Sequence, residues 1–381
     1  MERLYFDHAA TTPLDKEVFN KMIPYFTEFY GNPDSPHGIG RSAMNAVDAA
    51  RDKIAELIHA KPSEVYFTSG GTEADNWALI VGAYAQKAQG KTHIIISSIE
   101  HHAVLETANQ LEKAGFSVTR LPVGKDGRVE LADLKAALTD KTGLVALMAV
   151  NNETGVVQPI KEAAKLAHEK GSLFFTDAVQ AAPYMPIDVK EWGVDMLSFS
   201  SHKFYGPKGA GVLYIKSGIK TERLIVGGEQ ERGLRGGTTN VPTMVGLSAA
   251  YEKNVRGMSA TNERIERLKN RFLQGISALD GVVQNGGGEC VPSVVNLQFI
   301  GVENADFLYN MDLKGICVAA GSACASASIK PSHVLTAMGL TETEAKSSVR
   351  FSFGKDNTEE EIDKLVEATK EVVERLRKFK M

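Results

Sequence analysis

The chain has 381 residues, 43% of them hydrophobic, and its 43 basic and 47 acidic residues give a formal net charge of −4. This length exceeds the roughly 250 residues at which one hydrophobic core usually stops growing, so we expect two domains. No long block of like charge occurs, which excludes a typical nucleic-acid surface. No apolar run approaches the roughly 18 residues that span a bilayer, and the start of the chain carries no apolar signal region, so we expect a soluble, cytoplasmic protein.

The chain contains three cysteines, Cys290, Cys317 and Cys324. An odd and small number of cysteines excludes a disulfide framework, and the three lack the paired spacing of a zinc site. We therefore expect no metal site, and any functional cysteine should act as a thiol.

Short β-branched or aromatic runs alternate with helical segments from residue 62 to about residue 215. This alternation is typical of βαβ units and predicts an α/β fold with a mostly parallel sheet covered by helices. The expected helices between the strands occupy residues 73–89, 103–115 and 160–171. The expected strands are 64–68 "EVYFT", 93–98 "HIIISS", 143–150 "GLVALMAV", 172–177 "SLFFTD", 196–201 "MLSFSS" and 209–215 "GAGVLYI".

The pattern changes near residue 250, where a long charged helix is expected at 262–279. Shorter strands are expected at 293–301, 315–321 and 348–354, and a closing helix begins at a capping box formed by Thr358 and Glu361. These elements predict a smaller α+β domain. We assign residues 15–255 to the large domain, and residues 1–14 and 256–381 to the small one.

Polar residues follow five of the predicted strands of the large domain. Open α/β sheets bind ligands outside the carboxyl ends of their strands, so these residues are expected to share one edge. They are Thr72, His101, Asn152, Asp177, Gln180, Ser200, His202 and Lys203.

Two of these strand ends suit an aromatic, phosphorylated cofactor. The "SGGT" turn before the helix at 73–89 offers backbone N–H groups and the Thr72 hydroxyl to a phosphate, although neutral Gly-Gly turns are more common. Asp177 ends a buried strand and requires a cationic partner. A protonated ring nitrogen, as in pyridoxal phosphate enzymes, would supply one, and Asp177 could equally cap a helix beginning at 178.

Lys203 lies between a serine-rich strand end and the turn "GPKG". A lone lysine is usually a solvated surface charge. Here Ser200 and His202 accompany it, and an amine that loses its solvation becomes nucleophilic. Lys203 is therefore a candidate for a Schiff base with a carbonyl cofactor.

With these residues in place, the chain resembles the class V, fold-type I pyridoxal phosphate enzymes, and more narrowly the group I cysteine desulfurases of the NifS/IscS type. The resemblance rests on ten motifs in the order of that family. They are "LYFDHAATTPLD", "YGNPDSPHGIGR", "FTSGGTEADN", "SSIEHHAV", "VNNETGVVQPI", "TDAVQA", "SFSSHKFYGPKGAG", "RGGTTNVP", "GSACAS" and "SSVRFSFG". It implies a fold-type I transferase fold, assembled as a homodimer with active sites at the interface.

The resemblance implies that pyridoxal 5′-phosphate is bound as a Schiff base on Lys203, which later moves the Cα proton. It also implies that Asp177 pairs with the ring nitrogen, that His101 stacks on the ring as an acid or base, and that Thr238 reaches the phosphate of the other subunit. The full implied set of cofactor-binding residues is Gly71, Thr72, His101, Asn152, Asp177, Gln180, Ser200, Ser201, His202, Lys203 and Thr238.

The substrate of this family is L-cysteine, and the resemblance assigns its carboxylate to Arg350 and Asn152. A planar guanidinium suits a carboxylate because it can donate two parallel hydrogen bonds. Catalysis is assigned to Cys324, Lys203 and His101. Cys324 lies in a small-residue loop at about 318–332, where it takes the sulfur as a persulfide while alanine leaves.

A sulfur-acceptor protein is implied as partner, either a scaffold of the IscU type for iron–sulfur clusters or a thiolation enzyme for transfer RNA or a cofactor. The chain departs from the usual family pattern at Ala319, Ala320, Ala325 and Ser201. None of these changes removes a group that the chemistry requires. The alternatives are a selenocysteine lyase or another pyridoxal phosphate-dependent lyase or aminotransferase, and a scaffold without activity, against which the intact site argues.

Overall fold

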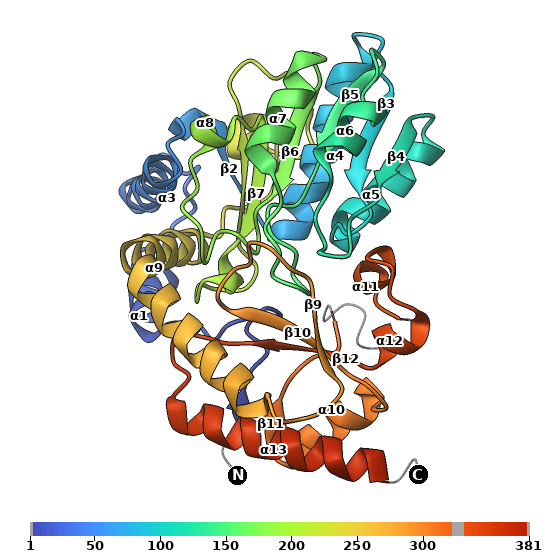
Figure 1. Ribbon diagram of the computed structural model, residues 1–381. Coiled ribbons are helices and arrows are strands. Elements are labelled where there is room, and N and C mark those ends of the chain that lie inside the picture. Colours follow the sequence, from blue (N-terminus) through green and yellow to red (C-terminus); the bar gives the residue numbers. More distant parts are fainter. Residues whose placement is uncertain (1–2, 322–330, 379–381) are drawn as a thin grey trace.

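The computed structural model describes residues 3–321 and 331–378. Figure 1 shows a larger upper part built on a sheet and a smaller lower part, with both chain ends beside the lower part. Cys324 lies outside the described residues.

The larger part contains a seven-stranded sheet in the order β2-β8-β7-β6-β5-β3-β4. Strands β4, β3, β5, β6 and β7 run parallel, and β8 is antiparallel to both β7 and β2. All six predicted strands form, which confirms the mostly parallel α/β sheet. The strands are β2 (Val65–Thr68), β3 (His93–Ser97), β4 (Ser117–Leu121), β5 (Thr142–Ala146), β6 (Leu173–Asp177), β7 (Met196–Ser200) and β8 (Gly211–Ile215).

The sequence interpretation missed β4, which lies at the edge of the sheet. Its sequence SVTRL is half polar, and its first and fourth residues are exposed to solvent. An edge strand that is partly solvated does not need the continuous apolar run by which the central strands were recognised. The missing apolar run explains the error.

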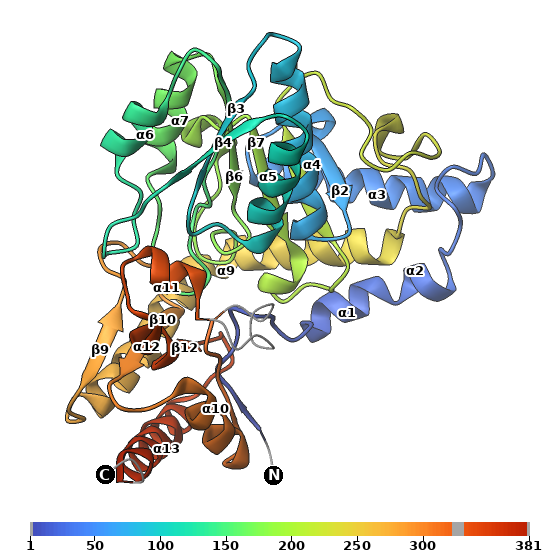
Figure 2. The same cartoon turned by 90° about the vertical axis from the view of Figure 1, so that its right-hand side faces the viewer.

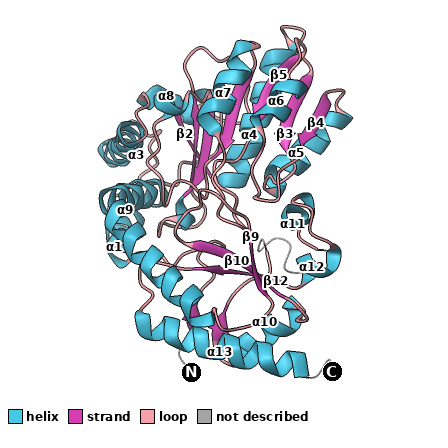
Figure 3. Ribbon diagram, in the orientation of Figure 1, coloured by secondary structure: helices cyan, strands magenta, loops and turns pink. Residues whose placement is uncertain are grey.

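Helices cover both faces of this sheet, as Figure 3 shows. On β3, Ile94 and Ile96 pack in the core that contains α4 and α5, whereas Ile95 packs in the core that contains α3, α6 and α7. Because successive side chains of a strand point to opposite faces, a fully apolar run is buried on both. The helices are α3 (Gly38–Leu57), α4 (Gly71–Lys87), α5 (His102–Lys113), α6 (Leu131–Ala137), α7 (Ile160–Glu169) and α8 (Val189–Trp192).

The smaller part has its own apolar core beneath an antiparallel sheet of order β12-β10-β9. A two-stranded parallel pair, β1 with β11, brings the N-terminal segment to this part. The predicted capping box is confirmed, since Thr358 Oγ1 accepts from Glu361 N and Thr358 N donates to the Glu361 carboxylate. The elements are β1 (Leu4–Tyr5), β9 (Val282–Asn285), β10 (Val294–Phe299), α10 (Asn304–Leu313), β11 (Ile316–Cys317), β12 (Ser348–Ser352) and α13 (Glu359–Lys378).

Helix α9 (Val241–Ile276) joins the two parts and runs between them in Figure 2. The helix expected at 262–279 is therefore wrong at its start, because Asn240 caps the helix and Pro242 lies in its first turn. Its buried residues up to Tyr251 belong to the core of the larger part, and those from Ile265 onward belong to the smaller one. The division at 255/256 falls inside this helix and stays a prediction.

Four short α-helices and three 3₁₀ helices, Pro62–Glu64, Ser201–Lys203 and Gln230–Gly233, complete the described elements. Helix α1 lies against α9, and α11 packs with Ile99 and Met148 below the large sheet. Among the helices of residues 3–321 and 331–378, none is long and apolar enough to cross a membrane. The bounds are α1 (Lys16–Met22), α2 (Pro24–Thr27), α11 (His333–Ala337) and α12 (Glu342–Lys346).

Candidate active site

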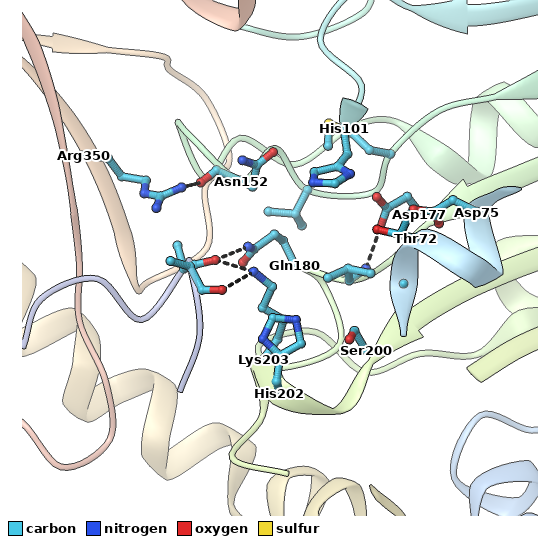
Figure 4. A pocket seen from close by; sticks show the side chains of 16 residues that line it. Thr72, Asp75, His101, Asn152, Asp177, Gln180, Ser200, His202, Lys203 and Arg350 are labelled. Atoms are coloured by element: carbon cyan, nitrogen blue, oxygen red, sulfur yellow. Dashed lines mark hydrogen bonds between the residues drawn. The ribbon is translucent and has the colours of Figure 1, made fainter. Parts of the chain in front are cut away.

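A cavity lies at the carboxyl ends of the parallel strands, and Figure 4 shows the side chains that line it. The strand-end residues were expected to meet at this edge, and the structure brings them together with Arg350 from β12. The predicted residues that line the cavity are Gly71, Thr72, His101, Asn152, Asp177, Gln180, Ser200, His202, Lys203 and Arg350.

Lys203 ends the short 3₁₀ turn that follows β7, and its amine points into the cavity (Figure 4). The Nζ atom donates to the carbonyl oxygens of Ala9 at 2.6 Å and Ala10 at 2.9 Å. Gln180 Nε2 donates to the same Ala9 oxygen at 2.8 Å. The amine is thus held by backbone acceptors of the N-terminal segment, which excludes the alternative of a solvated surface lysine.

Asp177 ends β6 and is buried, with 4% of its surface exposed. Its Oδ1 accepts from Val179 N at 2.8 Å, within a turn. The alternative that it caps a helix beginning at 178 is wrong, because residues 178–185 form turns and not a helix. Burial raises the pKa of the Asp177 carboxyl to about 6, against the opposing effects of the Val179 N–H and the Lys203 charge. A cation beside this carboxylate would therefore be strongly favoured.

A second carboxyl, Asp75, also lines the cavity and was missed by the sequence interpretation. It is fully buried on α4, and Ser198 Oγ donates to its Oδ1 at 2.5 Å. Burial, followed by the negative charge of Asp177, raises the pKa of Asp75 well above its usual value. Its place on α4, one turn after Thr72 on the same face, was the signal available in the sequence.

The start of α4 forms part of the same cavity wall. Its N-cap is Gly70, which has no side chain to satisfy the first backbone N–H groups of the helix. A Cβ atom at Gly71 would lie 2.8 Å from Val179 Cγ2, so the close approach of this turn to Val179 requires glycine. Thr72 and Ser200 face the same part of the cavity (Figure 4). This end is suited to an anion.

Two histidines beside the cavity are held in the neutral form. Burial lowers the pKa of His101 to about 4, and the positive charge of Lys203 adds to this effect. Burial also lowers the pKa of His202 to about 3, followed by the charges of Lys203 and Lys208. His101 Nδ1 accepts from Ala103 N at 3.1 Å, so the neutral ring carries its proton on Nε2.

Arg350 reaches the cavity from the smaller part and is 1% exposed. Its Nη1 donates to Asn152 O at 2.9 Å, and its Nη2 donates to Asp7 Oδ1 at 2.8 Å. Its buried Nε has no hydrogen-bond partner among the described residues. A guanidinium with a donor left over is suited to an incoming carboxylate. Asp7 was not singled out from the sequence.

Two of the predicted site residues do not line this cavity. Ser201 is buried, is not one of the described residues that line the cavity, and its hydroxyl packs against Gly206. Thr238 lines a separate surface hollow with Gln230 and Arg235. Cys324 lies outside the described residues. The assigned roles of all three stay predictions.

Comparison with known proteins shows the family to which the chain belongs. The family model described as aminotransferase class-V matches residues 4–365. The chain is 46% identical to a protein named cysteine desulfurase IscS from Clostridium botulinum (strain Hall), covering 99% of this chain and 96% of the relative. It is also 46% identical to the cysteine desulfurase IscS of Methanosarcina thermophila, covering 98% of this chain and 93% of the relative.

Solved structures show the same relationship. A NifS-like protein superposes with a TM-score of 0.91 at 38% identity, covering 98% of this chain and 99% of that one. The structure titled SspA in complex with cysteine superposes with a TM-score of 0.82 at 36% identity, covering 93% and 100%. The chain belongs to the aminotransferase class-V family, among its cysteine desulfurases of the IscS and NifS type.

Proposed function

We propose that this cysteine desulfurase holds pyridoxal 5′-phosphate on Lys203 and transfers the sulfur of L-cysteine to Cys324, with L-alanine as the second product. The observation that supports the proposal is the presence of Lys203, Asp177 and Arg350 in one cavity. An amine, a buried carboxylate and a guanidinium match an aldehyde, a protonated ring nitrogen and the carboxylate of an amino acid, respectively.

The donor set of the cavity fits the cofactor at both of its ends. The N-terminus of α4 with Thr72 and Ser200 would hold the phosphate, because its backbone N–H groups lack a side-chain cap. Asp177 would pair with the ring nitrogen, since a cation directly beside it would stabilise the buried carboxylate. Gln180 and His101 would lie along the ring. When bound, the cofactor withdraws electrons from the substrate and so labilises its bonds at Cα and Cβ.

The protein's own groups would bind and orient the substrate. Arg350 would bind the substrate carboxylate, with Asn152 beside it. The Lys203 amine, once released from the cofactor, would take the proton from the substrate Cα. The neutral His101, which carries its proton on Nε2, can donate a proton near the ring.

Sulfur transfer would then fall to Cys324. Its thiolate forms a bond with the substrate sulfur while the Cβ–S bond breaks, and Cβ takes up a proton. The enzyme sulfur and the substrate sulfur are thereby oxidised to a persulfide, and the substrate carbon is reduced to the methyl group of L-alanine. No external oxidant or reductant is required for this step.

The proposal extends to the partners of the protein. Thr238, in its separate hollow, would reach the phosphate in a second copy of the chain, which requires a homodimer. The persulfide would pass to a sulfur-acceptor protein for iron–sulfur cluster assembly or thiolation. A cytoplasmic location stays a prediction from the sequence.

The test is the release of alanine from L-cysteine, with a thiol reductant present, by the wild type, Cys324→Ala and the control Cys317→Ala. We expect the wild type and the control to release alanine, and Cys324→Ala to lose at least a hundredfold in rate. Equal release by all three would remove Cys324 from the mechanism. A parallel assay with L-selenocysteine would then decide whether the protein is a lyase.

A further inference from the structure

The carboxylate of Glu153 lies beside the described residues on both sides of segment 322–330. After the segment, Ser332 Oγ donates to Glu153 Oε2 at 2.5 Å. Before it, Gly321 faces the same carboxylate, since a Cβ atom placed on this glycine would lie 3.3 Å from Glu153 Oε2 and 3.6 Å from Oε1. Glu153 is itself only 1% exposed. One buried side chain thus lies next to both described ends of the segment.

Glu153 is held in place by its own neighbours. Asn151 Oδ1 accepts from Glu153 N at 2.9 Å and from Thr154 N at 3.0 Å. Asn296 Nδ2 on β10 donates to Glu153 O at 3.3 Å. The backbone N–H and C=O groups of Glu153 are therefore both hydrogen-bonded, the first within the larger part and the second to the smaller part. These bonds fix the position from which the Glu153 side chain extends.

The end that precedes the segment is joined to the substrate-binding strand. Ala319 and Arg350 form a backbone bridge, with Arg350 N donating to Ala319 O at 2.6 Å and Ala319 N donating to Arg350 O at 3.2 Å. The Arg350 side chain in turn donates to Asn152 O, next to Glu153. A displacement of the backbone at Ala319 would therefore displace the backbone of Arg350.

The residues that follow the segment are held next to the residues that flank His101. The Ser332 hydroxyl that donates to Glu153 also accepts from Leu335 N at 3.2 Å and so caps α11. The next residue, His333, places its ring 4.7 Å from the ring of His102 and bonds through Nε2 to Glu100 O at 3.0 Å. Helix α11 therefore begins against the residues that carry His101.

Gly321 and Ser332 are eleven residues apart in the sequence. A chain of that length can extend over about 36 Å, yet both of its described ends lie beside one carboxylate. We propose that Glu153 is a positioning residue for sulfur transfer, which fixes the two points from which the segment bearing Cys324 departs and returns. This inference rests on the proposed role of Cys324 as the sulfur acceptor.

The test compares two disruptive variants, Glu153→Ala and Ser332→Ala, with two conservative ones. Glu153→Gln keeps an oxygen that accepts from Ser332, and Ser332→Thr keeps the hydroxyl. Thr341→Ala is the matched control, because it removes the cap of the neighbouring helix α12 without a contact to Glu153. We expect kcat for alanine release to fall at least tenfold in both alanine variants with KM for cysteine within twofold of wild type. The conservative variants should stay within threefold in kcat, and the control within twofold.

A second readout does not depend on the cofactor or on turnover. Segment 322–330, SACASASIK, is rich in the small residues after which elastase cleaves. Loss of the anchoring contact raises the population of locally unfolded states of the described residues beside the segment, so cleavage within the segment should be at least threefold faster in both alanine variants. The conservative variants and Thr341→Ala should be cleaved at the wild-type rate. If Glu153→Ala does not fold, the Ser332→Ala and Ser332→Thr pair carries the test.

The outcomes separate this inference from the proposed function. Full alanine release by Cys324→Ala would overturn the role of Cys324. The positioning role alone would be overturned if Cys324→Ala loses activity while Glu153→Ala and Ser332→Ala keep either the wild-type kcat or the wild-type rate of cleavage. Failure of the conservative variants to restore kcat would also overturn it, because a hydrogen bond to the 153 side chain would not then be the cause.

Discussion

The guanidinium of Arg350 is paired with a carboxylate of its own chain, since Nη2 donates to Asp7 Oδ1 at 2.8 Å. Arg350 is buried, whereas the Asp7 side chain keeps 21% of its surface exposed. A substrate carboxylate that binds Arg350 must therefore share it with Asp7. The negative charge of Asp7 stabilises the buried cation in the free enzyme and weakens the binding of a second anion.

Replacement of Asp7 by asparagine should separate these two effects. We expect Asp7→Asn to lower KM for L-cysteine about threefold or more, because one competing charge is removed. The same change should lower the free energy of unfolding by about 2 kcal/mol, because a buried guanidinium loses its ion-pair partner. Initial rates and urea unfolding measure the two quantities. Asp7→Glu, which keeps the charge, is the control, and a higher KM in Asp7→Asn would contradict the prediction.

The two buried carboxyls of the cavity should respond differently to amide substitution. Burial and the charge of Asp177 raise the pKa of Asp75 well above its usual value, which favours the protonated carboxylic acid, and an amide resembles that form. Asp75→Asn should change kcat/KM by no more than about threefold, since its oxygen still accepts from Ser198. Asp177→Asn should lose about a hundredfold or more, because the proposed anionic partner of the protonated ring nitrogen is removed. A loss in Asp75→Asn as large as that in Asp177→Asn would show that Asp75 acts as an anion.

Acid should destabilise the protein through His8. Both ring nitrogens of this histidine are buried, and burial lowers its pKa to about 4. The unfolded chain binds a proton below about pH 6.5 while the folded one does not. This stability is therefore present above pH 6.5 and is lost as the pH falls toward 4. At pH 5 the loss amounts to about 2 kcal/mol.

His8→Asn, measured by urea unfolding at pH 7.5 and pH 5, checks this pH dependence. The variant should lose about 2 kcal/mol less than the wild type between the two pH values, because it carries no titrating group at this site. His59→Asn is the matched control, since the His59 side chain is 59% exposed. Residue 59 has a positive backbone φ of 59°, which asparagine also adopts readily. Equal pH dependence of the wild type and His8→Asn would refute the prediction.

Gly71→Ala should weaken cofactor binding. The added Cβ would lie 2.8 Å from Val179 Cγ2, so the turn at the start of α4 must move away from the phosphate position. We expect at least a tenfold loss of pyridoxal phosphate affinity, measured by absorbance titration of the cofactor-free protein. Gly257→Ala, on α9 with only an ordinary 3.8 Å contact to Thr261, should bind the cofactor like the wild type.

The sequence by itself determined the type of sheet and most of the cavity wall. Apolar runs mark β2, β3, β5, β6, β7 and β8, because a strand buried on both faces has no room for polar residues. Parallel strands bring their carboxyl ends to one edge, so residues such as His101, Asp177 and Lys203 were expected to meet there. The capping box at Thr358 was equally local, since its two partners are three residues apart.

The tertiary structure decided the charge balance inside the cavity. Asp7 and Arg350 are 343 residues apart, and Lys203 and Ala9 are 194 apart, so no local pattern links either pair. The half-polar edge strand β4 was also decided by tertiary structure, since it forms by pairing with β3. Hydrophobic periodicity reports which face of an element is buried, but not which distant group it is buried against. For that reason the partners of Arg350, Lys203 and Glu153 became visible only in the folded molecule.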